Sequence, residues 1–265
     1  MPALPPLSPP LWGLVFVLGC TITLWLISLR TRDVSVIDIF WGIGIAGVVD
    51  IAAWLGHAGG DRAAMVLFLV NIWAIRLAAH IWARHEGEDH RYAAMRHQFG
   101  RRWWWWSLVQ VFLLQAILIW VIAAPPVGAV LNGFAPMGWL DYLGAGIATL
   151  AIIFEAVADQ QLARFRADPA NKGKVMDRGL WGWSRHPNYF GESLLWWGLF
   201  AIGFSATGQW WLLVSPVLVT FLLLQVSGVT LMEDKMEDRR PAYAAYKRRV
   251  SAFVPWPRRQ KTRKP

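Results

Sequence analysis

The sequence SRHPNYFGE at residues 184–192 runs directly into the apolar stretch SLLWWGLF at residues 193–200. Proline is favoured in the first turn of a helix, so a helix is expected to begin near Pro187. Glu192 then lies just over one turn inside that helix. A carboxylate inside a bilayer costs roughly 2.5–3.5 kcal/mol, so it usually faces a partner or a cavity. The segment therefore predicts a polar ligand site at the mouth of a membrane helix.

The composition around this segment predicts an all-α integral membrane protein. Of 265 residues, 56% are hydrophobic and 19 are tryptophan, which is unlike ordinary soluble domains. About 20 apolar residues span a bilayer as a helix. Seven stretches reach or approach this length, namely residues 11–29, 36–55, 64–83, 105–130, 139–158, 189–204 and 210–232.

The distribution of basic residues predicts the orientation of these seven transmembrane helices. Lysine and arginine gather after the first, third and fifth stretches and in the C-terminal tail, and the other loops hold only Arg62. Basic loops stay in the cytoplasm, so the N-terminus is expected outside and the C-terminus in the cytoplasm. This topology accounts for most of the net charge of +9 without nucleic acid. Membrane lipids are the expected surroundings.

A single membrane domain is expected over residues 1–265. Helices within residues 1–135 are expected to hold a substrate cavity, and residues 136–258 a cofactor site. Cys20 is the only cysteine, and no metal-ligand spacing occurs, so neither a disulfide nor a metal site is predicted. The GIGIAG sequence at residues 42–47 matches the GxGxxG consensus of dinucleotide-binding sites. It lies inside a predicted span, where small residues serve close helix packing.

Ionisable residues occupy several positions that a bilayer penalises. Asp38 opens the second span. Arg76 and His80 are four residues apart in the third and so share a face. Glu155 and Asp159 are spaced in the same way in the fifth. With Glu192, they are expected to line a polar cavity open to the cytosol. Interhelical ion pairs, such as Arg76 with Glu155 or Asp38, are the alternative.

The segment EGEDHRYAAMR at residues 86–96 mixes acids, bases and a phenol. Two interpretations stand side by side. The segment is either an amphipathic surface stretch or a lid over the cavity, with Tyr92 as a proton donor.

Three of these segments resemble one family. They are SRHPNYFGE at 184–192, DIFWG at 38–42 and EDHRY at 88–92, and YAAYKRRVSAFVPW at 243–256 fits with them. They resemble DUF1295, a bacterial membrane family of unknown function that is similar to the steroid 5-alpha-reductases. The resemblance implies a seven-helix oxidoreductase of a bacterial inner membrane. Such an enzyme uses NADPH from the cytoplasmic side to reduce a carbon–carbon double bond conjugated to a ketone, here in a lipid-like substrate.

The resemblance also implies a cofactor site in the C-terminal half. Asn188 and Glu192 correspond to a pair beside the nicotinamide, and the basic loop residues are natural phosphate partners because guanidinium groups bind phosphate bidentately. The cofactor-binding residues implied in this way are Arg76, Asp159, Arg164, Arg166, Lys174, Arg178, Arg185, His186, Asn188, Tyr189, Glu192 and Tyr246.

The ketone-binding residues of the steroid reductases are not reproduced. Those enzymes place a glutamine–glutamate pair on the second helix and a tyrosine on the third, where this sequence has Asp38-Ile39 and Trp73. A protonated Asp38 could donate to the carbonyl oxygen, and Tyr92 could replace the missing phenol. Asp38, Tyr92 and Glu192 are therefore the catalytic candidates.

A second family offers an alternative function. Arg185-His186-Pro187 before an apolar helix, with later acids at Glu233 and Asp234, also resembles the isoprenylcysteine carboxyl methyltransferases. Those enzymes bind S-adenosylmethionine with a similar C-terminal architecture. The basic loop favours NADPH, because S-adenosylmethionine carries no phosphate. A non-enzymatic membrane scaffold or transporter is the third possibility.

Overall fold

The structure, a computed structural model, describes residues 7–226 and 241–257. Within these residues the fold is helical without strands, and one isolated bridge pairs Ser184 with Ser251. The predicted all-α fold is thereby confirmed. Glu233 and Asp234 lie outside the described residues.

Several helices begin or end at or near the bounds of the predicted apolar stretches. The α-helices are α1 (Pro9–Thr31), α2 (Val36–Leu55), α3 (Gly60–Trp82), α4 (His90–Phe99), α5 (Trp103–Ser107), α6 (Leu114–Ile122), α7 (Ala124–Leu131), α8 (Trp139–Ala167), α9 (Pro187–Thr207), α10 (Val214–Phe221) and α12 (Pro241–Arg249). Tighter or wider helical turns are η1 (Gly100–Arg102), η2 (Leu108–Leu113), η3 (Pro169–Asn171), η4 (Gly179–Gly182), η5 (Trp210–Leu213) and η6 (Leu222–Val226).

The chain divides into two compact units. The first comprises Met1–Ala145 and Leu199–Ser215, and the second comprises Gly146–Gly198 and Pro216–Pro265. The expected single membrane domain, with its division near residue 135, stays a prediction.

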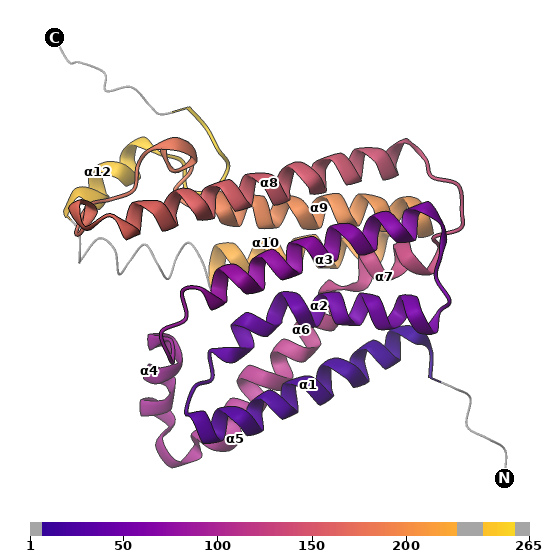
Figure 1. The fold of residues 1–265 in the computed structure, drawn as a ribbon, viewed down its shortest axis with the longest axis horizontal. Coiled ribbons are helices and arrows are strands. Elements are labelled where there is room, and N and C mark those ends of the chain that lie inside the picture. Colours follow the sequence, from indigo (N-terminus) through magenta and orange to yellow (C-terminus); the bar gives the residue numbers. More distant parts are fainter. Residues whose placement is uncertain (1–6, 227–240, 258–265) are drawn as a thin grey trace. The chain divides into compact units, whose positions relative to one another are not determined.

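In the first unit, α2 packs against both α1 and α3 (Figure 1). Small residues permit the close approach. A Cβ on Gly42 would lie 3.3 Å from the Cα and carbonyl oxygen of Ala74 on α3. A Cβ on Gly13 of α1 would lie 2.9 Å from Cγ1 of Val48. The glycines in residues 42–47 therefore lie in a packed helix, which agrees with the packing interpretation of that motif.

The predicted span 105–130 is interrupted where two prolines occur. α6 ends at Ile122, and α7 begins at Ala124 with Pro125 and Pro126 in its first turn. Proline lacks the backbone N–H that would continue the helical ladder. The Ser215 hydroxyl donates to the Ile122 carbonyl oxygen at 2.8 Å, so that buried acceptor has a partner.

A buried ion pair holds the start of α3 in the first unit. Arg62 Nε donates to Asp141 Oδ1 at 2.7 Å, and the Arg62 side chain also donates to the carbonyl oxygens of Asn132, at 2.7 Å, and Pro136, at 2.8 Å. The Ser205 hydroxyl donates to the second Asp141 oxygen at 2.7 Å. Arg62 is only 1% exposed. The one basic residue of the predicted outer loops is thus a structural residue.

In the second unit, α8 and α9 lie side by side (Figure 1). Phe154 of α8 meets Phe190 of α9 edge to face, with ring centroids 5.9 Å apart. The loop between the helices is held to α8 by the Trp181 indole, whose N–H donates to the Ala158 carbonyl oxygen at 2.9 Å.

Five helical runs are long and apolar enough to cross a membrane: Pro9–Thr31, Val36–Leu55, Gly60–Trp82, His90–Ile122 and Trp139–Ala167. They indicate a membrane protein in contact with lipid. The helix over the predicted sixth span, α9, is not among the five, and the described part of the seventh, Trp210–Val226, is shorter. Seven spans and the direction of the termini stay predictions.

Candidate functional site

Two catalytic candidates meet in the first unit. Tyr92 of α4 donates its phenolic hydrogen to Asp38 Oδ1 at 2.8 Å, and Arg91 Nη2 donates to Asp38 Oδ2 at 3.0 Å. Gln115 Nε2 donates to the Tyr92 oxygen at 3.4 Å. We call these four residues the α2–α4 cluster. It pairs Asp38 with Arg91 and Tyr92 rather than with Arg76, which was one predicted alternative.

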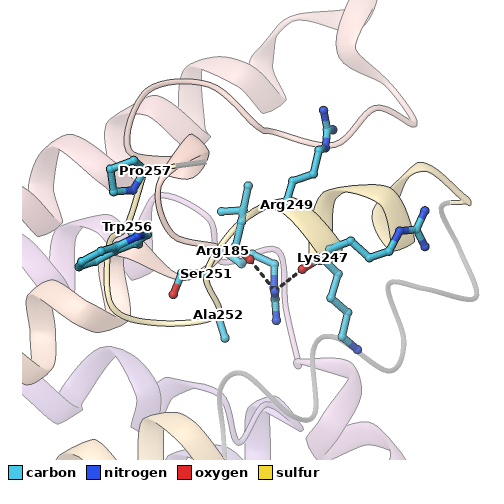
Figure 2. Close-up of a pocket in the computed structure, with 9 residues that line it drawn as sticks. Arg185, Lys247, Arg249, Ser251, Ala252, Trp256 and Pro257 are labelled. Atoms are coloured by element: carbon cyan, nitrogen blue, oxygen red, sulfur yellow. Dashed lines mark hydrogen bonds between the residues drawn. The ribbon is translucent and has the colours of Figure 1, made fainter. Parts of the chain in front are cut away.

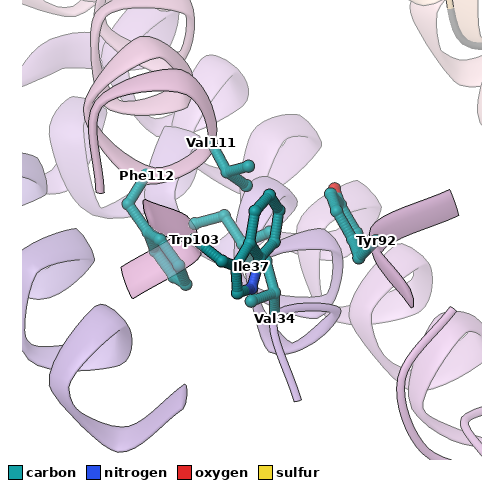
Figure 3. Close-up of a cluster of buried hydrophobic side chains, with 6 residues drawn as sticks. All are labelled: Val34, Ile37, Tyr92, Trp103, Val111 and Phe112. Atoms are coloured by element: carbon teal, nitrogen blue, oxygen red, sulfur yellow. The ribbon is translucent and has the colours of Figure 1, made fainter. Parts of the chain in front are cut away.

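The Tyr92 ring lies in an apolar cluster, so its hydroxyl is the polar end of a buried side chain. Figure 3 shows the ring near side chains from the start of α2 and from the α5–η2 segment. The cluster consists of Val34, Ile37, Tyr92, Trp103, Val111 and Phe112. Tyr92 itself is 7% exposed. Val111 and Phe112 belong to the π-helical turn η2, a feature often found at functional sites.

Polar contacts tie the loop before α2 to the loop before α4. His85 Nε2 lies 2.7 Å from Asp33 Oδ2, and the Asp89 amide donates to the Ser35 hydroxyl oxygen at 2.6 Å. Asp89 also caps α4 by accepting from the Arg91 amide at 2.8 Å. Burial raises the pKa of Asp89, but the hydrogen bonds and charge of Arg91 outweigh it and hold the pKa below its usual value.

The segment 86–96 thus contains the start of α4, and its polar contacts bind it to the loop before α2. Glu88 adds to the docking by accepting from the Arg96 guanidinium at 2.6 and 3.0 Å. His85 adds to it through its close pair with Asp33.

Buried carboxylates gather in the second unit where α8 and α9 meet. Asn188 Nδ2 donates to Asp159 Oδ1 at 3.2 Å, and the Trp196 indole N–H donates to Glu192 Oε1 at 2.9 Å. Asp159 is 5% exposed and Glu192 is 7% exposed. We call Glu155, Asp159, Asn188, Glu192 and Trp196 the α8–α9 cluster. It brings together three of the predicted cofactor residues, namely Asp159, Asn188 and Glu192.

A glycine sets the spacing of the two helices there. A Cβ on Gly191 would lie 2.9 Å from the Cβ of Glu155 and 3.1 Å from its Cα and backbone nitrogen. Only a residue without a side chain lets the helices approach this closely. Gly191 therefore allows the close contact between α8 and α9, and the amide of Asn188 and the carboxylate of Glu192 lie on either side of it in the sequence.

The residues that precede α9 are bound to α12 and the chain after it. The Tyr246 hydroxyl donates to the Trp181 carbonyl oxygen at 2.6 Å, and the Ser184 hydroxyl donates to the Phe253 carbonyl oxygen at 2.7 Å. Arg185 Nη1 donates to the carbonyl oxygens of Lys247, at 2.9 Å, and Val250, at 2.7 Å. Arg185 and Tyr246, both predicted to bind cofactor, thus make backbone contacts that hold the start of α9.

Two further predicted cofactor residues stack on each other. The His186 and Tyr189 rings lie 5.5 Å apart at an angle of 7°. His186 is buried and Tyr189 is half-buried.

The predicted phosphate partners lie on the surface of the second unit. Arg164, Arg166, Lys174 and Arg178 are all exposed. Arg76 lies on α3 in the first unit and is half-buried.

A family model with the description "Protein of unknown function (DUF1295)" matches residues 24–250. The chain belongs to the DUF1295 family. The family predicted from the segments around residues 38, 88, 184 and 243 is thereby confirmed.

This DUF1295 chain is also similar to an uncharacterized protein of the yeast Schizosaccharomyces pombe. The two are 26% identical over 272 residues, which cover 91% of this chain and 78% of the yeast protein. No solved structure matches the chain.

Several residues of the two clusters were absent from the sequence-based prediction of the DUF1295 site. Gln115 is a polar amide within the apolar stretch 105–130, and a polar residue in such a stretch indicates a possible site residue. Arg91 stands beside Tyr92, but its contact with Asp38 joins residues 53 positions apart. Trp196 lies four residues after Glu192, a helical spacing that places both side chains on one face.

Proposed function

We propose that this protein is a membrane-embedded reductase that uses NADPH to reduce a carbon–carbon double bond conjugated to a ketone in a lipid-like substrate. The α8–α9 cluster carries the proposal. Asn188 offers an amide beside the buried carboxylates of Asp159 and Glu192, at the start of a helix. Buried ionisable groups of this kind are costly and are commonly retained for function.

The surface arginines of the second unit suit a phosphorylated cofactor. Arg164 and Arg178 are exposed, and their side chains make no hydrogen bond or ion pair with other residues in the described part of the chain. Their guanidinium groups are therefore able to donate two parallel hydrogen bonds to phosphate oxygens. Arg166 and Lys174 add positive charge to the same stretch. NADPH, when bound, would supply the hydride, while the protein would bind and orient it.

We assign the substrate side of the reaction to the α2–α4 cluster. Tyr92 is the proposed proton donor. Asp38 holds its hydroxyl in place before substrate binds, and the phenolic hydrogen would turn from Asp38 to the substrate for transfer, with Arg91 opposite the Asp38 charge. A donor aimed at a carbonyl oxygen stabilises the negative charge that develops there during reduction. The apolar cluster around Tyr92 favours an apolar substrate.

The proposed enzyme has seven spans, with its N-terminus outside and its C-terminus in the cytoplasm of a bacterium, and it lies in the inner membrane. The basic segments after the first, third and fifth spans support this orientation.

An S-adenosylmethionine-dependent methyltransferase is the second candidate. Two buried carboxylates, Asp159 and Glu192, suit the cationic groups of S-adenosylmethionine as well as they suit an amide. The exposed arginines favour the dinucleotide, because S-adenosylmethionine has no phosphate for them to bind.

Ligand-induced thermal stabilisation of the detergent-purified protein tests the proposal. NADPH, NADH and S-adenosylmethionine are titrated separately, since a ligand that binds the folded state stabilises it by about 2.7 kcal/mol at one hundred times its Kd. We expect NADPH to raise the Tm most. A rise with S-adenosylmethionine alone would replace the reductase by the methyltransferase, and no rise with any ligand would remove both.

The variant Glu192→Gln locates the site. It keeps the shape of the side chain and removes its charge, so we expect at least a tenfold weaker NADPH affinity with an unchanged fold. Glu86→Gln, at an exposed carboxylate of the first unit, is the matched control and should bind NADPH as the unaltered protein does. Unchanged affinity in Glu192→Gln would remove Glu192 from the cofactor site.

A further inference from the structure

A basic pocket of about 490 Å³ lies beside the C-terminal end of α12, within the second unit (Figure 2). Its volume is within the range of about 300–1,000 Å³ that small-molecule sites occupy. The residues that matter for its chemistry are Arg185, Lys247, Arg248, Arg249, Ser251 and Trp256. We call it the α12 pocket.

The pocket is built around a fixed guanidinium group. Arg185 is 8% exposed, and its Nη1 bridges the carbonyl oxygens of Lys247 and Val250 at 2.9 and 2.7 Å. Its backbone amide donates to the Ser251 carbonyl oxygen at 2.9 Å. Figure 2 shows Arg185 at the centre of the lining residues. One wall of the pocket is therefore held in place by the start of α9.

Positive charge dominates the lining. Four cationic residues line the pocket, and among the described residues no carboxylate contributes to it. Like charges brought this close repel one another, and a concave surface of one sign attracts the opposite sign. The chemistry of the pocket therefore selects an anion, and arginine fits phosphate oxygens best.

Exposed apolar side chains beside the pocket indicate which kind of phosphate-bearing ligand it binds. Trp256 is 68% exposed, Val254 is 54% exposed and Trp183 is 54% exposed. The Trp256 amide donates to the Trp183 carbonyl oxygen at 3.0 Å, so the two tryptophans are neighbours. Tryptophan next to lysine and arginine is typical of the headgroup layer of a bilayer, and basic clusters there bind anionic lipids.

We propose that the α12 pocket binds the phosphate group of an anionic membrane lipid. Lys247 and Arg248 supply the charge that attracts the headgroup, Arg185 forms the fixed floor, and Trp256 packs against the glycerol region. The proposal does not depend on the reductase assignment, and Arg185 is the one pocket residue that the family resemblance also implied for the cofactor.

Binding of short-chain phosphatidylglycerol to the full-length protein in detergent tests the proposal. We expect phosphatidylglycerol to bind more tightly than phosphatidylcholine. In the double variant Lys247→Gln/Arg248→Gln, we expect about 25-fold weaker binding of phosphatidylglycerol, because each basic residue strengthens such contacts by about fivefold. The charge-matched control Arg84→Gln/Lys172→Gln, at exposed positions outside the pocket, should stay within about twofold of the unaltered protein.

Two further titrations separate the sources of phosphate. Inorganic phosphate at millimolar concentration should not displace phosphatidylglycerol, and the pocket variant should keep its NADPH-induced Tm shift. Equal binding of the two lipids, equal losses in the two double variants, or displacement by inorganic phosphate would overturn the proposal. Loss of NADPH binding with phosphatidylglycerol binding intact would assign the pocket to the cofactor and overturn it too. Should the double variant not fold, Arg248→Gln alone should show about a fivefold loss.

Discussion

At the scale of single residues, the surroundings of the Tyr92 hydroxyl hold it in one orientation. It donates to Asp38, lies near the Gln115 amide and is carried by a ring that is 7% exposed. Arg91 balances the Asp38 charge from the other side. This arrangement holds the phenol in one place with its hydrogen on Asp38, and proton donation to a bound substrate would require that hydrogen to turn from Asp38 to the substrate.

The substitution Tyr92→Phe measures what this hydrogen bond contributes. We expect it to lower the free energy of unfolding by roughly 1–2 kcal/mol, because a hydrogen bond to a charged carboxylate is lost while the ring still packs. Thermal or denaturant unfolding in detergent gives the value. Tyr142→Phe, at a tyrosine that is 64% exposed, should change it by less than about 0.5 kcal/mol. Equal effects of the two variants would mean that the Asp38 contact contributes nothing to stability.

The sequence identified Asp38 and Tyr92 separately but not as a pair. Each stood out by its type, a carboxylate at the start of a span and a phenol in a charged loop. Their contact joins residues 54 positions apart, and that distance is closed only by the packing of α2 against the segment that carries α4. Arg62 shows the same limit, because nothing local to it reveals that Asp141 lies 2.7 Å away.

At the scale of helices, the contact between α8 and α9 positions the proposed cofactor residues. Gly191 brings the backbone of α9 against Glu155, and Asn188 reaches Asp159 from the turn before it. A change in helix spacing would therefore act on the α8–α9 cluster without altering any polar group in it.

The variant Gly191→Ala tests this dependence. Its added methyl group would lie 2.9 Å from the Glu155 Cβ, so the helices must shift, at an expected cost of about 1–3 kcal/mol in the free energy of unfolding. Gly146→Ala in α8 is the control, since a Cβ there meets nothing within 4 Å. That control should be neutral or stabilise by up to about 1 kcal/mol. A neutral Gly191→Ala would show that the close contact is not required.

Helix positions were more predictable than helix irregularities. The apolar stretch 36–55 is α2 to the residue, and Pro187 begins α9 as its place in the sequence suggested. The π-helical turn η2 within residues 108–113 carries no proline or glycine to announce it. Such a turn arises from packing against neighbouring elements, which local sequence does not encode.

At the scale of the whole molecule, the number of spans depends on α9. Its 21 residues reach about 31 Å at 1.5 Å per residue, which matches the hydrocarbon core. It is not among the five helical runs that are long and apolar enough to cross a membrane, and Asn188, Glu192 and Ser193 fall in its first two turns. The length of α9 favours a span and the polar residues of its first two turns oppose one, so the prediction of seven spans depends on the distribution of basic residues between the helices.

Cysteine labelling decides between these topologies, because Cys20 is the only cysteine to remove. In a Cys20→Ser background, single cysteines are placed at His57, Lys172 and Gln209, which are exposed positions in three different loops. With seven spans and the N-terminus outside, a membrane-impermeant maleimide applied to intact cells should label positions 57 and 209. Position 172 should react only after lysis. With five spans, position 209 would lie with position 172 in the cytoplasm and stay unlabelled, and a reversed orientation would exchange the pattern at all three positions. Labelling at position 209 from outside, with position 172 protected until lysis, would therefore establish α9 as a span. It would also place Asn188 and Glu192 near its cytoplasmic end, on the side from which a soluble dinucleotide must enter.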